Sequence, residues 1–316
     1  MRLWKWMLLG LLGVFPGWAE ESKLPAKGER VLFLGDSITW AGDYVTDVIS
    51  WAEAGPCRGL GITWLNLGLS SETVSGLSEE GHAGGSFPRP DLHERLGRVL
   101  EKTEPDRVFA CYGMNCGIQQ PWSEERFSKY RDGMHRLKRA VEESGAEIVF
   151  LTPPYFDGTK APDKAYYTEV LARYAAWLVE QRREGWEVID VNGAMTEAIL
   201  KRRETEPGFS VQSDAVHPNA AGHWMMAAPV IAYLGGKEVA AAGSIDAALA
   251  AVGMGTAWRE LCKQRMVLQR DAWLTATGHQ RPGVPVGLPL VEMEAKVAAI
   301  EGRMRALMAE SGQSGD

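Results

Sequence analysis

The chain has 316 residues, of which 45% are hydrophobic and 24% charged, and its formal net charge at pH 7 is -7. This composition is typical of a folded globular protein and excludes collagen-like, low-complexity and wholly disordered chains. No apolar run reaches the roughly 20 residues that a membrane-spanning helix needs, and an acidic balance argues against a nucleic-acid partner.

The first 19 residues are predicted to be a secretory signal peptide. Arg2 and Lys5 precede an apolar stretch over residues 7–15, and small residues follow at Gly17 and Ala19. A positive, then apolar, then small-residue order is typical of such peptides. An uncleaved amphipathic anchor is the alternative. We therefore expect a secreted or periplasmic protein that is cleaved after Ala19.

The middle of the chain alternates between short apolar runs and helical patterns. Five runs are predicted to be strands: residues 31–34, 62–67, 107–112, 147–151 and 187–191. Helices are predicted between and after them, over about 43–54, 92–100, 124–141, 167–178 and 220–234. Apolar strands joined by crossover helices indicate a doubly wound α/β sheet with helices on both sides. In such a sheet, ligands bind beyond the carboxyl ends of the strands.

The chain is predicted to divide into a main domain over residues 28–236 and a helical C-terminal extension over residues 244–316. The last predicted helix carries apolar residues at spacings of three and four: Leu290, Met293, Val297, Ile300, Met304 and Leu307. This stripe is expected to pack against the parent domain, because it is short for a coiled coil. A dimer seam is the alternative, so we expect a monomer and keep a dimer open.

Four cysteines leave the redox state open: Cys57, Cys111, Cys116 and Cys262. An even number in an exported protein allows two disulfides, in three connectivities. Buried free thiols are the alternative. The chain has no Cys-x-x-Cys sequence and no pair of histidines at metal-ligand spacing, so no structural zinc is predicted.

Polar groups follow the ends of the first three predicted strands. The first strand ends in the sequence GDS, which places Ser37 at its carboxyl end, while Gly68 follows the second strand and Asn115 the third. Late in the chain, Asp214 stands three residues before His217. Each residue alone could belong to a turn or a helix cap. In a doubly wound sheet, however, all of them are expected at the same edge.

These five residues have the chemistry of a serine acyl-transfer site. A serine hydroxyl is a poor nucleophile until an adjacent base takes its proton, so Ser37 is paired with His217. Asp214 would hold the imidazole in the correct tautomer and stabilise the imidazolium. The oxyanion of the tetrahedral intermediate needs N–H donors. We predict these to be the backbone N–H groups of Ser37 and Gly68 and the side-chain amide of Asn115.

On these residues the sequence resembles the SGNH hydrolases, also called GDSL esterases. The Ser, Gly, Asn and His that name the family occur here in the family's order, and Asp214 matches the Asp of its Asp-x-x-His block. The resemblance covers roughly residues 28–234. It implies a three-layer α/β/α, flavodoxin-like fold with a five-stranded parallel sheet, ester hydrolysis, and no cofactor or metal. One departure is Cys116, which follows Asn115 where the family often has Asp.

The substrate is predicted less directly. Export and the family resemblance favour removal of a small acyl group from a polysaccharide or glycoside, and the resemblance implies that this group is acetyl, as it often is in the family. Trp40, Trp122 and Trp224 lie near the site in sequence and could stack on sugar rings or fill the core. A lipase-like activity and a non-catalytic carbohydrate-binding module are the alternatives. His223 is a minor candidate for the base, because its pattern places it within a helix.

Overall fold

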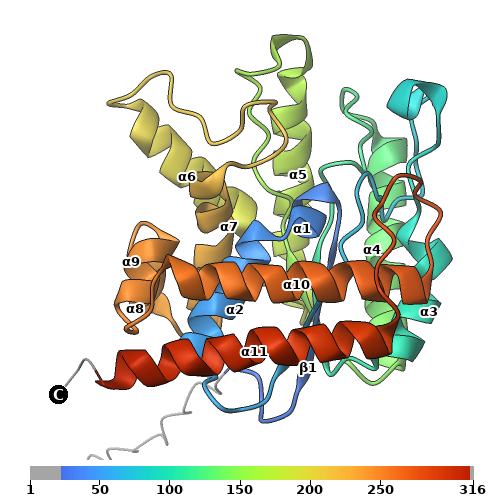
Figure 1. The fold of residues 1–316 in the computed structure, drawn as a ribbon. Helices are drawn as coiled ribbons and strands as arrows, with labels where there is room; N and C mark the ends of the chain where they lie inside the picture. The colour runs from blue at the N-terminus through green and yellow to red at the C-terminus, as the bar shows by residue number, and fades with distance from the viewer. Residues whose placement is uncertain (1–22, 314–316) are drawn as a thin grey trace, which may run out of the picture.

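The computed structural model describes residues 23–313 (Figure 1), so the predicted signal peptide lies outside the described residues. Its centre is a five-stranded sheet with the order β2-β1-β3-β4-β5, in which every neighbouring pair is parallel. The strands are β1 (Arg30–Gly35), β2 (Thr63–Asn66), β3 (Arg107–Cys111), β4 (Glu147–Leu151) and β5 (Glu187–Ile189). The predicted five-stranded parallel sheet is confirmed.

The strands form a buried sheet because their side chains are apolar on both faces. In the register, Phe33 of β1 lies opposite Phe109 of β3. Their rings stack with centroids 5.1 Å apart and an interplanar angle of 14°. Both side chains are almost completely buried, so this pair lies at the centre of the core.

Helices cover both faces of the sheet, which confirms the three-layer α/β/α fold (Figure 1). On one face, α2 and α7 pack against each other, and α3 and α4 form a contact on the other. The helices within residues 37–233 are α1 (Ser37–Ala41), α2 (Asp43–Ala54), α3 (Leu92–Thr103), α4 (Glu124–Glu143), α5 (Tyr166–Glu180), α6 (Val191–Arg203) and α7 (Ala220–Tyr233).

Two of these helices were not expected from the sequence. The five-residue α1 begins at Ser37, directly after β1. The predicted strand over 187–191 ends at Ile189, and Asp190 instead caps α6 by accepting the Gly193 N–H at 2.9 Å. The aspartate therefore starts a helix where the apolar pattern alone suggests that the strand continues.

The C-terminal segment is helical and comprises α8 (Lys237–Ala240), α9 (Ile245–Ala250), α10 (Thr256–Thr277) and α11 (Leu290–Gln313). Helix α10 lies across the direction of the strands (Figure 1) and contacts the edge strand β2 as well as α2 and α3. It thereby covers a strand edge that would otherwise be free to pair with another chain. Helix α11 lies beside α10 and buries Met293, Val297 and Met304 of the predicted stripe. The stripe thus packs mainly on α10 of the same C-terminal segment, and Met304 also joins a buried cluster that includes Ala54 of α2. The predicted packing against the main domain is therefore observed only in part.

All four cysteines are buried free thiols. Burial raises the pKa of the Cys57 thiol to about 11 and that of Cys116 and Cys262 to about 12. The structure therefore agrees with the free-thiol alternative. Within residues 23–313, no helix is both long and apolar enough to cross a membrane.

Candidate active site

Ser37 occupies a sharp turn between β1 and α1. It is the first residue of α1, and Asp36 caps the helix by accepting the Ile38 N–H at 3.0 Å. A Cβ on Gly35 would lie 2.1 Å from the Thr39 Oγ1 and 2.8 Å from the Cys111 carbonyl oxygen. Only glycine fits there, so the chain can turn tightly and present the Ser37 hydroxyl at the carboxyl end of the sheet.

A continuous hydrogen-bonded chain joins Ser37 to His217 and Asp214. The Ser37 Oγ lies 2.9 Å from the His217 Nε2, and the His217 Nδ1 lies 2.7 Å from the Asp214 Oδ2. A carboxylate only accepts, so the Nδ1 carries the proton in this arrangement and the Nε2 is free to accept from the serine. The structure thus brings together three of the five residues that the sequence singled out.

The loop before α7 fixes the relative position of Asp214 and His217. The Asp214 Oδ1 accepts the backbone N–H groups of Val216 at 3.0 Å and of His217 at 2.7 Å. Ala215, between them, has a φ of 69°, and its carbonyl oxygen accepts the Asp157 N–H at 3.0 Å. This tight turn, rather than a helix, places both side chains on the same side.

Electrostatics favour an ionised Asp214. Partial burial raises its pKa, but the hydrogen bonds from His217 and Val216 outweigh that effect and hold the pKa below its usual range. The side chains of His217 and Asp214 are 50% and 53% exposed. A bulky alcohol that carries an ester can therefore approach this side of the site.

Asn115 follows β3, as predicted, and is 5% exposed. Its Nδ2 donates to the Glu72 carbonyl oxygen at 3.3 Å. Because an amide nitrogen has two hydrogens, a second donor is available for a ligand. The neighbouring Cys116 Sγ accepts the Val74 N–H at 3.4 Å, which ties the same loop to the segment after β2.

Gly68 has a packing role that the sequence did not reveal. Its N–H donates to the Asn66 Oδ1 at 2.9 Å, so an oxyanion would have to share that hydrogen. A Cβ on Gly68 would lie 2.4 Å from the Trp40 N and 2.7 Å from the Thr39 carbonyl carbon. Glycine at this position lets the segment after β2 pack directly on the backbone of α1.

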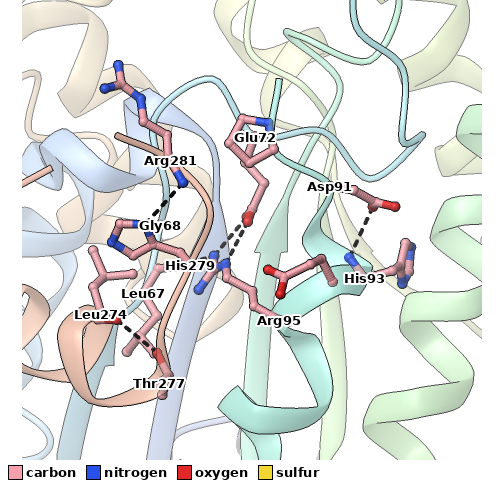
Figure 2. A network of polar contacts seen from close by, with 12 residues as sticks. Leu67, Gly68, Glu72, Asp91, His93, Arg95, Leu274, Thr277, His279 and Arg281 are labelled. Atoms are coloured by element: carbon pink, nitrogen blue, oxygen red, sulfur yellow. Dashed lines mark hydrogen bonds and ion pairs between the residues drawn. The ribbon is translucent and has the colours of Figure 1, made fainter. Parts of the chain in front are cut away.

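A buried ion pair supports the segment that carries Gly68 (Figure 2). Arg95 of α3 donates to Glu72 through its Nε at 2.6 Å and its Nη2 at 2.8 Å, and the same Nη2 donates to the Leu67 carbonyl oxygen at 2.7 Å. The Tyr112 hydroxyl donates to the Glu72 Oε2 at 2.7 Å. Since Glu72 also accepts from Asn115, this network connects the loops after β2 and β3. Sequence reasoning missed it, although an Arg on the buried face of a predicted helix is a signal.

The other residues noted in the sequence are His223 and three tryptophans, which pack against neighbouring side chains. His223 is buried in α7, with its Nε2 3.9 Å from the Asp43 Oδ2, and burial lowers its pKa to about 4. Trp224 is buried, and Trp122 packs within 4.9 Å of the Phe127 ring centroid. The ring of Trp40 packs against the guanidinium of Arg270. Within the part of the chain that the structure describes, no three His, Cys, Asp or Glu residues gather closely enough to hold a metal ion.

The chain is similar in sequence to an acetylxylan esterase and similar in fold to several solved structures. It is 24% identical to an acetylxylan esterase from Geobacillus stearothermophilus over 229 residues, which are 66% of this chain and 94% of that protein. The structure of a catalytic mutant of an acetylxylan esterase from the same organism aligns with a TM-score of 0.51 at 22% identity, covering 67% of this chain and 96% of that one. A gut microbial diltiazem-metabolizing enzyme aligns with a TM-score of 0.53 at 21% identity, over 68% of this chain and 48% of that one.

A model of the GDSL-like lipase/acylhydrolase family matches residues 33–225. This range is more than half of the chain and includes all five residues of the candidate site. The chain therefore belongs to the GDSL-like lipase/acylhydrolase family, whose fold is that of the SGNH hydrolases, and is a carboxylic-ester hydrolase.

Proposed function

We propose that the protein is an exported serine esterase that removes small acyl groups, chiefly acetyl, from carbohydrate. Ser37 is the nucleophile, His217 the general base and Asp214 the residue that orients His217. The observation that carries this proposal is the unbroken hydrogen-bonded chain from the Ser37 hydroxyl through the imidazole to the carboxylate.

The reaction follows from that geometry. As the Ser37 oxygen attacks the ester carbonyl carbon, its proton passes to the His217 Nε2, and Asp214 stabilises the imidazolium. His217 then donates the proton to the leaving alcohol, which leaves an acyl-enzyme on Ser37. A water molecule repeats the sequence on the acyl carbonyl, with His217 again as base, and releases the acid.

Donors for the oxyanion are proposed from three positions. The Ser37 N–H is at the first position of α1, where N–H groups have no partner within the helix, and the Asn115 amide has a second hydrogen to donate. The Gly68 N–H contributes only if it shares its bond to Asn66. Each such donor is typically worth about 3 to 4 kcal/mol in the transition state.

Two observations support carbohydrate as the alcohol component. The curated relative that the chain matches over 94% of that protein's length is named an acetylxylan esterase. In addition, His217 and Asp214 are about half exposed, so the site can receive an ester on a large alcohol. Export is inferred from the order of residues 1–19.

The proposal is tested by hydrolysis of p-nitrophenyl acetate with the wild-type protein and Ser37→Ala. We expect kcat to fall by at least about 10⁴-fold in the variant. Equal rates in the two proteins would instead indicate a binding module. Acetylated xylo-oligosaccharides, followed by mass spectrometry, and p-nitrophenyl esters of increasing chain length then separate carbohydrate deacetylation from a lipase-like preference.

A further inference from the structure

The helix that carries Ser37 is too short to hold its own position. Helix α1 has five residues, little more than one turn, and so short a helix is unstable without tertiary contacts. Hydrogen bonds from the Trp40 N–H to the Asp36 carbonyl at 2.8 Å and from the Gly42 N–H to the Ile38 carbonyl at 3.2 Å close that turn. The placement of the Ser37 hydroxyl therefore depends on what α1 contacts.

Side chains from outside α1 bind its last three carbonyl oxygens. The Thr39 carbonyl accepts from the Asn66 Nδ2 at 2.6 Å, the Trp40 carbonyl from the Arg270 Nη1, and the Ala41 carbonyl from the Lys263 Nζ. The carbonyl end of a helix carries partial negative charge, so cations are favourable there. Both cations are on α10.

One face of α10 packs against the carbonyl end of α1. Lys263, Met266 and Arg270 are spaced by three and four residues, so they lie on the same side of the helix. The Met266 Sδ accepts from the Asn66 Nδ2 at 3.3 Å, and a Cβ on Gly42 would lie 2.4 Å from the Met266 Cε. The α1–α2 junction therefore packs closely against Met266 on this face of α10.

Arg270 is itself held rigidly. It is 5% exposed, and its Nε and Nη2 lie 2.9 Å and 2.8 Å from the Asp271 Oδ1. Its guanidinium carbon lies 4.3 Å from the centroid of the Trp40 ring, in cation–π geometry. Arg270 thus fixes both the backbone and the ring of a residue that is three positions from Ser37.

These contacts come from outside the part of the chain that matches the family. The match ends at residue 225, whereas α10 spans Thr256–Thr277. The C-terminal segment thus contributes contacts to the nucleophile helix in addition to covering the edge of β2.

We propose that Arg270, together with Lys263, is a positioning residue for acyl transfer: α10 clamps the carbonyl end of α1 and so aims the Ser37 hydroxyl at His217. This inference rests on the function proposed above. A misplacement of about 1 Å in a reacting group can cost about 100-fold in rate. Loss of the clamp should therefore lower kcat with little change in KM.

The test compares Arg270→Gln with a matched control, Arg265→Gln. Arg265 is also a buried arginine of α10, at 9% exposure, but it pairs with Glu53 of α2 at 2.6 Å and Glu301 of α11 at 3.7 Å. Both substitutions remove a buried guanidinium from the same helix. Only Arg270→Gln removes the guanidinium that donates to a carbonyl oxygen of α1, that of Trp40.

The readouts are kcat and KM for p-nitrophenyl acetate, measured below the Tm of every variant. We expect Arg270→Gln to lower kcat by about 10- to 100-fold, Arg265→Gln to stay within about twofold of wild type, and Arg270→Lys to recover part of the loss because it keeps a cationic donor. Equal losses of kcat in the two glutamine variants would overturn the proposal. If Arg270→Gln does not fold, Lys263→Met takes its place in the same comparison.

Wild type and Ser37→Ala are measured alongside these variants. A wild-type rate that does not depend on Ser37 contradicts the proposed function. A Ser37-dependent rate that Arg270→Gln and Arg265→Gln lower equally contradicts only the clamp.

Discussion

Asp36 is a buried carboxyl group next to the nucleophile. It is 3% exposed, and burial raises its pKa from 3.8 to about 6, although the hydrogen bond from the Ile38 N–H and the charge of His217 act in the opposite direction. The fold therefore favours the neutral form. Its contribution to stability is fully present below the unfolded value of 3.8 and is lost as the pH rises through about 6.

Asp36→Asn removes the cost of burying an ionised carboxylate, and it keeps a side-chain oxygen that can cap α1. We expect the variant to exceed wild type in free energy of unfolding by about 1 to 3 kcal/mol at neutral pH, and by less near pH 4, since a pKa shift of one unit corresponds to about 1.4 kcal/mol. Urea denaturation across that pH range measures the difference. A difference that does not grow with pH would contradict the assignment.

Asp214→Asn should change the free energy of unfolding in the opposite direction from Asp36→Asn. The pKa of Asp214 is held below its usual range, so its charge stabilises the fold above the unfolded pKa and that contribution is lost as the pH falls through the lower, folded pKa. The asparagine variant should be less stable than wild type at neutral pH, and the gap should close in acid. The same denaturation series shows whether the two aspartates differ in this way.

At the scale of helices and strands, the spacing of apolar residues predicted those elements whose local sequence pattern agrees with their tertiary packing. Each strand appeared as an apolar run, and the helix predicted over about 124–141 is α4, which begins at Glu124. Helix α1 is too short to show a period. Helix α6 has buried residues at a spacing of four, Val191, Met195 and Ile199, but the first of them reads as the end of a strand.

The same distinction applies to the candidate site. The Asp-x-x-His spacing and the GDS sequence, combined with the alternation of strands and helices, predicted that Ser37, His217 and Asp214 come together. The use of the Gly68 N–H by Asn66 could not be predicted, because it depends on how closely the loop after β2 packs on α1. Likewise, nothing in the local sequence of α10 indicates that its cations face the nucleophile helix.

Gly68→Ala tests that close packing. The added Cβ would meet the backbone of Thr39 and Trp40 at less than 3 Å, and backbone can move only by displacing α1. We expect kcat for p-nitrophenyl acetate to fall more than about tenfold and stability to fall by about 1 to 3 kcal/mol. Gly97→Ala, on α3 with nothing within 4 Å of the new Cβ, should retain full activity. Similar behaviour of the two variants would contradict this account.

At the scale of the whole molecule, the core carries the stability without covalent cross-links. The four cysteines are free, and all are at most 3% exposed. Burial raises the thiol pKa values, from about 11 at Cys57 to well above the usual value at Cys111. These thiols are consequently both inaccessible and protonated at neutral pH.

Titration with Ellman's reagent should therefore find almost no reactive thiol in the folded protein and four in denaturant without reductant, which is the full number in the chain. Two or fewer thiols after unfolding would reveal disulfides. Rapid reaction of the native protein would contradict the packing around α2, β3 and α10.

The assignment of Ser37 is tested most directly by a fluorophosphonate, which reacts covalently only with an activated serine. After labelling and digestion, mass spectrometry should place the adduct on Ser37, and His217→Ala should slow labelling by at least about 100-fold because the base is lost. An adduct on another residue, or labelling of Ser37 that does not depend on His217, would contradict the account.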